Sequence, residues 1–146
     1  MQASATWLLV DDDEIDLELV RRTMRREQIE LDTAEARGGE QALDWLRREG
    51  RTRGSVVVLL DLRMPRMTGH EFLAAVRADP ALRRTRVFVL STSHDRRDIA
   101  LAYDQGAVGY FVKGDNASLR DQLRCIAEYT RLASLPVPSD AALKGI

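Results

Sequence analysis

Residues 56–69, VVVLLDLRMPRMTG, contain the features that decide the fold. The segment opens with five apolar residues, three of them β-branched, which is typical of a strand buried on both faces of a parallel sheet. Asp61 follows directly, so its carboxylate is expected at the carboxyl edge of the sheet, where open α/β sheets hold their sites. Pro65 then indicates a turn, and Thr68 with Glu71 forms the pattern of a helix capping box.

A second apolar segment, residues 7–10, is also expected to form a strand, and it ends in three consecutive aspartates. If the two strands are parallel neighbours, Asp11 and Asp12 converge on Asp61. Two unit charges ~4 Å apart repel by about 4 kcal/mol at a surface-like effective dielectric. A cation is the natural compensation, and oxygen ligands with room for water suit Mg²⁺. A simpler interpretation stays open for Asp13 and Glu14: acidic residues at the start of a helix complement the helix dipole.

Two further strands are expected at residues 86–90 and 108–112, and they are followed by Ser91 and Lys113. A short second strand is expected at residues 29–34. Periodic apolar positions and capping signals predict helices between and after the strands, at residues 14–27, from Gly38-Gly39 onward, at 71–78, at 94–105 and from Asn116 onward. This alternation predicts an α/β fold, a doubly wound parallel sheet covered on both faces.

The carboxylates, hydroxyl and lysine at the ends of successive strands resemble the receiver domain of two-component response regulators, over residues 6–132. The resemblance implies a five-stranded flavodoxin-like (βα)5 fold with strand order 2-1-3-4-5. It also implies that Asp61 accepts a phosphoryl group in a Mg²⁺-dependent reaction, with Lys113 and Ser91 as catalytic partners. The chain would then be a phosphoacceptor signalling protein that catalyses only its own phosphorylation and dephosphorylation.

By the same resemblance, Asp12, Asp61 and the backbone carbonyl of Arg63 ligate the Mg²⁺ ion, while Asp11 acts through water. Ser91 and Tyr110, on the fifth strand, are the expected switch residues. The family usually has a proline after its lysine, whereas this chain has Gly114. A non-proline cis bond costs about 2.5–4 kcal/mol, so the Lys113–Gly114 bond is expected to be trans.

The implied partner is a sensor histidine kinase that donates phosphate from a phosphohistidine. Asp16 in the acidic start, the VLSTS strand end, the glycine after the lysine and the proline-bearing tail resemble single-domain regulators that partner bacterial and cyanobacterial phytochrome kinases. Residues 1–134 are expected to be the receiver and residues 135–146 a tail without a separate output domain. A homodimer is expected through the fourth helix, fifth strand, fifth helix and tail, with Pro136 and Pro138 holding the tail extended across the partner.

Composition excludes several other classes of function. The 146 residues suffice for one domain, and a formal net charge of -1 gives no electrostatic case for nucleic acid or an anionic membrane. Cys125 is the single cysteine, which favours the cytoplasm over an oxidising compartment, and no apolar run is long enough to span a bilayer. His70 and His94 are isolated in the sequence, so loop or helix-cap roles are expected for them.

Two alternatives stay open at this point. A phosphatase of the haloacid-dehalogenase type would use an Asp-x-Asp motif after its first strand, and Asp11 with Asp13 has that spacing without the usual residues after it. A receiver-like interaction module that is never phosphorylated would also fit the fold, because a fold alone does not name a function. The presence of Asp12, Asp61, Ser91 and Lys113 argues against the second alternative.

Overall fold

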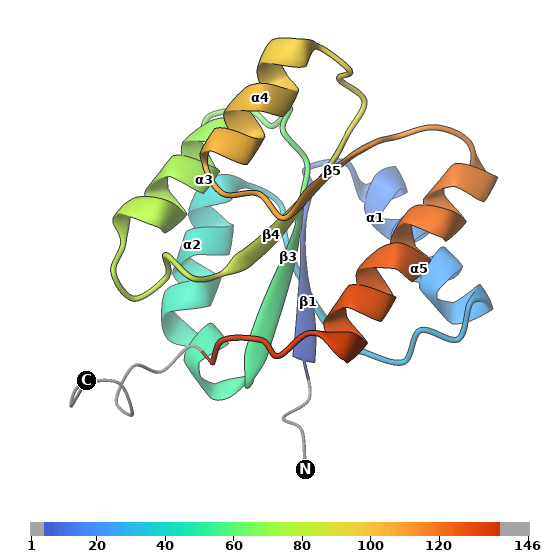
Figure 1. Cartoon of the computed structure of the whole chain (residues 1–146), viewed down its shortest axis with the longest axis horizontal. Coiled ribbons are helices and arrows are strands. Elements are labelled where there is room, and N and C mark those ends of the chain that lie inside the picture. Colours follow the sequence, from blue (N-terminus) through green and yellow to red (C-terminus); the bar gives the residue numbers. More distant parts are fainter. Residues whose placement is uncertain (1–4, 138–146) are drawn as a thin grey trace.

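The computed structural model describes residues 5–137, which form one parallel sheet with helices on both faces (Figure 1). The sheet has the strand order β2-β1-β3-β4-β5, as predicted. Its strands are β1 (Ala5–Val10), β2 (Asp32–Ala36), β3 (Ser55–Leu60), β4 (Arg86–Ser91) and β5 (Gly109–Val112). All neighbouring strands pair in parallel. Every residue of β1 and β3 is buried, which agrees with the uninterrupted apolar runs in the sequence.

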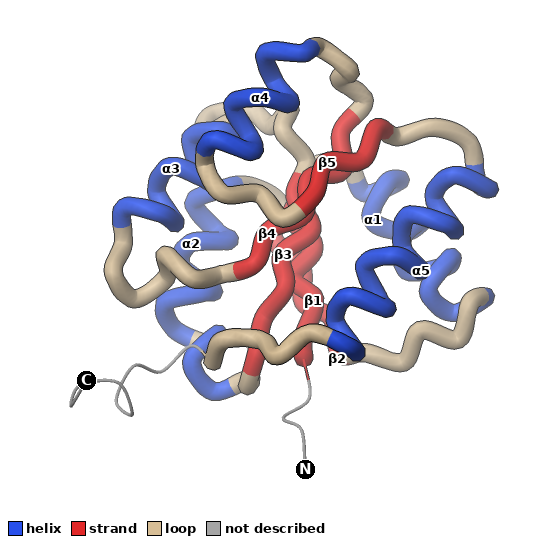
Figure 2. Tube along the Cα trace, viewed as in Figure 1, coloured by secondary structure: helices blue, strands red, loops and turns tan. Residues whose placement is uncertain are grey.

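Helices cover both faces of the sheet, so the strands form the middle layer (Figure 2). The helices are α1 (Glu14–Arg26), α2 (Gly39–Arg48), α3 (Gly69–Ala78), α4 (Arg96–Asp104) and α5 (Asn116–Leu132), with a 3₁₀ turn, η1 (Gly50–Thr52), after α2. The layers are α1 and α5 on one side, and α2, α3 and α4 on the other. Among residues 5–137, no helix combines the length and the apolar character that a membrane span requires.

Two apolar cores hold these layers together, one on each face of the sheet. Under α1 and α5, Trp7 of β1 is fully buried, and its indole N–H donates a hydrogen bond to the Thr130 hydroxyl of α5 at 3.1 Å. On the opposite face, Phe72 and Leu73 of α3 are fully buried against residues of the same strands. Successive residues of a strand point to opposite faces, so the apolar runs of β1 and β3 supply both cores.

The loop from Asp61 to α3 is held tightly under the end of β3. The capping box is confirmed: the Thr68 hydroxyl accepts from the Glu71 N–H, and the Glu71 carboxylate accepts from the Thr68 N–H. A Cβ on Gly69 would lie 2.5 Å from the Leu62 Cα and 2.8 Å from the Asp61 carbonyl oxygen. Glycine is therefore required at this position because the two backbone segments pack against each other without room for a side chain.

The predicted second strand was placed too early in the sequence. The structure has β2 at Asp32–Ala36, whereas the prediction was residues 29–34. The chain is still closing the end of α1 at Gln28, which has φ 55°, and at Ile29, whose N–H donates to the Met24 carbonyl. Ile29 and Leu31 pack against the core from this loop, so their apolar character does not mark a strand. The other elements agree with the predicted ranges to within two residues at the ends compared.

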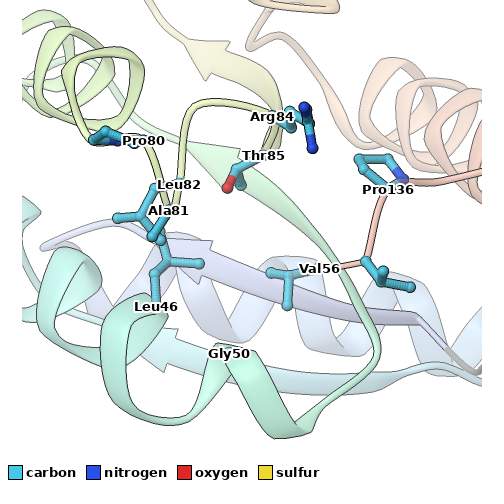
Figure 3. Close-up of a pocket in the computed structure, with 10 residues that line it drawn as sticks. Leu46, Gly50, Val56, Pro80, Ala81, Leu82, Arg84, Thr85 and Pro136 are labelled. Carbon is cyan, nitrogen blue, oxygen red and sulfur yellow. The ribbon is translucent and has the colours of Figure 1, made fainter. Parts of the chain in front are cut away.

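The first residues of the predicted tail pack on their own chain. Leu135 lies against the core under α1 and α5, and the Pro136 carbonyl accepts a hydrogen bond from the Ser55 hydroxyl at 3.1 Å. Beside them lies a cavity of about 30 Å³, lined in part by Leu46 and Val56 (Figure 3). It lies at the opposite edge of the sheet from Asp61 and has room for about one water molecule. Pro138 and the rest of the predicted tail lie outside the described residues.

Candidate functional site

The predicted carboxylates come together at the carboxyl edge of the sheet. The strands β1 and β3 are in register up to Val10 and Leu60, and the Asp61 N–H donates to the Val10 carbonyl at 2.9 Å. Asp11, Asp12 and Asp61 each present a carboxylate oxygen, and these oxygens all lie within 4.8 Å of one another. Asp11 is buried and Asp12 is exposed, so the cluster extends from the protein interior to solvent.

The ammonium group of Lys113 lies beside this cluster. Its Nζ is 3.8 Å from Asp61 Oδ1 and donates a hydrogen bond to Asp11 Oδ2 at 3.1 Å. It donates another to Asp16 Oδ2 at 2.9 Å, a contact that the sequence did not predict. The Lys113–Gly114 bond is trans, as expected, because no cis peptide bond occurs in residues 5–137. The end of β5 therefore brings one positive charge to the carboxylates that follow β1 and β3.

Burial and crowding shift the proton equilibria of these groups. Burial raises the pKa of Asp61 to about 6; Lys113 opposes this, while the nearby Asp11 and Asp12 charges add to it. Burial also raises the pKa of Asp11, against a hydrogen bond from the Asp13 N–H and the charge of Lys113. For Lys113, burial lowers the pKa, but the charges of Asp11 and Asp61 outweigh it and raise the value overall. The site thus holds more negative charge than its single ammonium balances.

The donor set fits a hard divalent cation. All three members of the cluster offer carboxylate oxygens, the ligands that Mg²⁺ and Mn²⁺ accept, and the exposed side of the site leaves room for water. Burial, together with the nearby Asp11 and Asp12 charges, raises the pKa of Asp61, so its ionised form requires compensation by positive charge. A divalent cation would supply that compensation, with Asp11, Asp12 and Asp61 as the residues that hold it.

The predicted hydroxyl and loop residues surround the cluster at different depths. Ser91 is the last residue of β4 and is fully buried; its Oγ accepts a hydrogen bond from the Ser93 N–H at 3.1 Å. Arg63 is exposed, and its N–H donates to Asp61 Oδ1 at 3.4 Å. An open hollow over the site is lined by Asp12, Asp13, Glu14, Asp16, Asp61, Arg63, Thr92 and Lys113. Asp61 is therefore accessible from solution through this hollow.

Tyr110 on β5 is half-buried and packs against the core under α2, α3 and α4. Its hydroxyl donates a hydrogen bond of 2.7 Å to the Ser93 carbonyl. Because the Ser93 N–H donates to Ser91, a chain of two hydrogen bonds joins Ser91 to Tyr110. The structure therefore brings the two predicted switch residues together through one backbone position.

A polar cluster that the sequence did not predict extends from Ser93 to α3 and α4. The Ser93 hydroxyl donates to Asp98 Oδ2 at 2.6 Å, and His70 Nε2 lies 3.1 Å from Asp98 Oδ1. Hydrogen bonds from Ser93 and His70 lower the pKa of Asp98. The expectation that His70 serves a loop or cap role is wrong, since this residue lies within α3 and pairs with Asp98 on α4. Residues 28 positions apart carry no local signal of such a pair.

Comparison with known proteins identifies the family. The sequence model of the response regulator receiver domain matches residues 7–124. The response regulator Rcp1 of the cyanobacterium Synechocystis is 32% identical over 122 residues, which cover 82% of each chain.

Two solved structures have the same arrangement of elements. The phosphorylated cyanobacterial phytochrome response regulator RcpA has a TM-score of 0.79 at 32% identity, and the match covers 92% of this chain and 99% of that one. The Mn²⁺-bound form of Rcp1 has a TM-score of 0.78 at 29% identity, with 90% and 98% coverage. This family match does not favour the phosphatase alternative.

The charge at Asp61 predicts a pH-dependent effect of Asp61→Asn in the metal-free protein. The pKa of Asp61 is about 6 in the folded protein, against an ordinary value of 3.8. Between pH 3.8 and about 6, the folded protein therefore binds a proton at Asp61 that the unfolded chain has released. The unfolding free energy falls as pH rises through this window. The difference corresponds to at most about 3 kcal/mol, and this value already includes the attraction between Asp61 and Lys113. We expect the asparagine variant to gain about 1–3 kcal/mol in unfolding free energy at pH 7.5 and less than about half of that at pH 4.5.

Urea denaturation with a chelator present measures both values. Asp121→Asn, a change at an exposed carboxylate on α5, serves as the control and is expected to stay within about 0.5 kcal/mol of the parent. Equal stabilities of Asp61→Asn and the parent at pH 7.5 would contradict the prediction.

Proposed function

Because this chain belongs to the family of response regulator receiver domains, the signalling modules of two-component systems, we propose that Asp61 accepts a phosphoryl group from a phosphohistidine. The observation that carries this proposal is the position of Asp61: it shares a carboxylate cluster with Asp11 and Asp12 and lies 3.8 Å from the Lys113 ammonium. The open hollow above Asp61 leaves room for a large phosphoryl donor to reach its carboxylate. We further propose that the reaction occurs in the cytoplasm, which the single free Cys125 favours.

The proposed reaction transfers the phosphoryl group from nitrogen to oxygen. A carboxylate oxygen of Asp61 attacks phosphorus in line with the P–N bond, which breaks as the P–O bond of the acyl phosphate forms. The donor imidazole leaves with the electron pair of that bond and takes a proton. The protein contributes position and charge compensation, since phosphoryl transfer requires little else.

The chain's own residues supply part of that compensation. Lys113 Nζ is within reach of the oxygens of a phosphoryl group on Asp61. Ser91 Oγ accepts from Ser93, and this role leaves its own hydrogen available to donate to a phosphoryl oxygen. Mg²⁺, held by Asp12, Asp61 and the Arg63 carbonyl directly and by Asp11 through water, would neutralise further negative charge when bound.

We propose a sensor histidine kinase of the bacterial phytochrome class as the donor. Support comes from the relatives: RcpA is described as a cyanobacterial phytochrome response regulator, and it matches nearly all of the described chain. The kinase must approach the hollow at the end of the sheet, where the acidic first turn of α1 and the end of β5 frame Asp61.

The readout of phosphorylation is proposed to follow the hydrogen bonds from Ser91. A phosphoryl group adds about 1.5–2 negative charges, and movement of Ser91 toward it would disturb the Ser93 backbone and the Tyr110 hydroxyl bonded to it. Asp98 on α4 is bonded to the same serine, so α4 receives the same disturbance. Ser91 and Tyr110 are therefore proposed as the switch residues.

The surface formed by α4, β5 and α5 is proposed to mediate a homodimer. Leu101 and Tyr103 on α4 are 43% and 50% exposed, and Leu132 at the end of α5 is 67% exposed. Apolar side chains that face water on the elements tied to the switch are suited to bind a second copy of the chain. Only Leu135–Val137 of the proposed tail can be described, and Leu135 and Pro136 contact their own chain.

Asp61→Asn is expected to abolish phosphoryl uptake while the fold is retained, because the amide keeps the volume of the side chain and removes the nucleophile. The protein is incubated with Mg²⁺ and acetyl phosphate, and intact mass is recorded over time. The parent should gain one phosphoryl group. Uptake that persists in the variant would move the acceptor to another residue, and rapid turnover of many phosphate esters by the parent would support a phosphatase instead.

Asp12→Ala is expected to weaken Mg²⁺ binding by about tenfold or more, and Asp11→Ala by less. Asp12 is proposed to touch the ion, whereas Asp11 acts through water and also holds Lys113. Isothermal titration with Mg²⁺ gives both affinities. Asp121→Ala, at an exposed carboxylate of α5, is the control. If both site variants bind Mg²⁺ as the parent does, the ligand assignment is wrong.

Leu101→Glu with Tyr103→Glu is expected to disrupt the dimer, because two charges would have to be buried in its interface. Sedimentation equilibrium of the parent, with and without phosphoryl on Asp61, measures the association. Ile15→Glu changes an apolar residue on α1 that is 77% exposed and should leave association unchanged. A version ending at Ser134 tests the tail in the same assay. A monomeric parent in both states, well above micromolar concentration, would refute the dimer.

A further inference from the structure

The Lys113 ammonium is held by two carboxylates, and one of them lies outside the proposed metal cluster. Nζ is closer to Asp16 Oδ2, at 2.9 Å, and to Asp11 Oδ2, at 3.1 Å, than to Asp61 Oδ1, at 3.8 Å. An ammonium group has three N–H donors. Asp11 and Asp16 occupy two of them, so the third remains for an acceptor on the side of Asp61.

Packing alone does not fix the Lys113 side chain. It borders a cavity of about 90 Å³ between α1 and α5, lined largely by leucines and by Asp16 and Gln122. Close-packed neighbours normally restrict a side chain, and they are missing on this side. The Gln122 amide holds the chain just before the lysine through a 2.8 Å hydrogen bond to the Val112 carbonyl. The position of the ammonium group therefore depends on its ionic partners.

Asp16 is better placed than Asp11 to act as a lasting anchor. It is the third residue of α1, and the side chain of Asp13 caps that helix by accepting from the Ile15 N–H. Asp11 belongs to the carboxylate cluster, so a bound cation would compete with Lys113 for its oxygens. Among the described residues, the oxygens close enough to share an ion come from Asp11, Asp12 and Asp61, and Asp16 is not one of these residues. Asp16 can therefore keep its contact with Lys113 while a cation is bound.

We propose that Asp16 is a positioning residue: it holds the Lys113 ammonium so that one N–H faces the phosphoryl group that Asp61 accepts. The inference rests on the proposed function of Asp61 and adds a residue to it. Asp16 itself touches neither Asp61 nor the phosphoryl group in this proposal. Its effect passes through Lys113, and that dependence makes the proposal testable.

The test compares Asp16→Ala with Asp16→Asn in the full chain. Asparagine retains an oxygen that accepts from Lys113, whereas alanine retains none. We expect the initial rate of phosphorylation by acetyl phosphate with Mg²⁺, followed by intact mass, to fall about tenfold in Asp16→Ala and to stay within about twofold in Asp16→Asn. Glu18→Ala, which removes a carboxylate from the same helix that pairs with Arg21, is the control and should match the parent.

A role through Lys113 also predicts the result in a Lys113→Ala background. There, Asp16→Ala and Asp16→Asn should have rates within about twofold of each other. Equal rates of the two variants in the presence of Lys113, or an alanine defect that persists without Lys113, would overturn the proposal, because either result fits a general effect of charge or structure.

A second measurement does not depend on phosphorylation. In the metal-free protein at low temperature, ¹⁵N-edited NMR follows the exchange of the Lys113 ammonium protons with water, and we expect faster exchange in Asp16→Ala, with protection retained in Asp16→Asn. Unchanged exchange in the alanine variant overturns the inference. A parent that gains no phosphoryl group overturns the proposed function of Asp61, and the role of Asp16 with it. If the parent gains a phosphoryl group and the two Asp16 variants are phosphorylated at equal rates, only the role of Asp16 is overturned.

Discussion

Repulsion among carboxylates at one edge of the sheet is the constraint on which the rest of this structure depends. Parallel strands end at the same edge, so the aspartates that follow β1 and β3 lie beside one another, partly out of water. Each pair of charges costs several kcal/mol at ~4 Å unless it is compensated. Lys113 provides one positive charge, and burial still leaves the pKa of Asp61 at about 6. The arrangement is unfavourable for the resting protein and favourable for a bound cation. The proposed phosphoryl transfer to Asp61 would depend on such positive charge, because a phosphoryl group is itself negatively charged.

The fold class and the acidic centre of the site could be predicted from local patterns in the sequence, whereas the strand order 2-1-3-4-5 was predicted only from the resemblance to receiver domains. Five apolar residues before Asp61 predict a strand buried on both faces of the sheet. An acidic run after a second such strand is then expected at the same carboxyl edge of the sheet, near Asp61. The second strand was predicted, but its bounds were placed too early. The residues of this edge strand, Asp32–Ala36, are mostly polar, while the apolar Ile29 lies in the preceding loop. The apolar residues Ile29 and Leu31 pack against the core under α1 and α5, so they do not indicate a strand of the sheet.

Two of the contacts that the sequence did not reveal join elements far apart in the chain. Asp16 and Lys113 are 97 positions apart, and an acidic residue in the first turn of a helix is usually explained by the helix dipole. Its contact with the lysine depends on how closely α1 approaches the end of β5, which side-chain packing decides. His70 and Asp98 meet for a similar reason, because α3 and α4 lie on the same face of the sheet. Isolated polar residues carry no periodicity that could predict such pairs.

The unequal anchoring of α4 and α5 indicates where a change at the site can have an effect. Four residues of α5 are buried, and Thr130 is also tied to Trp7 by a buried hydrogen bond. Of the nine residues of α4, only Ala102 is buried, so apolar packing holds this helix weakly. Near the start of α4, Asp98 joins this helix to Ser93 and to His70 through polar contacts. Segments that bury few apolar contacts are the ones that move at low cost in free energy. Because Ser93 is bonded to both Ser91 and Tyr110, a shift of the β4–α4 loop toward a phosphoryl group would alter the attachment of α4, while α5 stays fixed by its core residues.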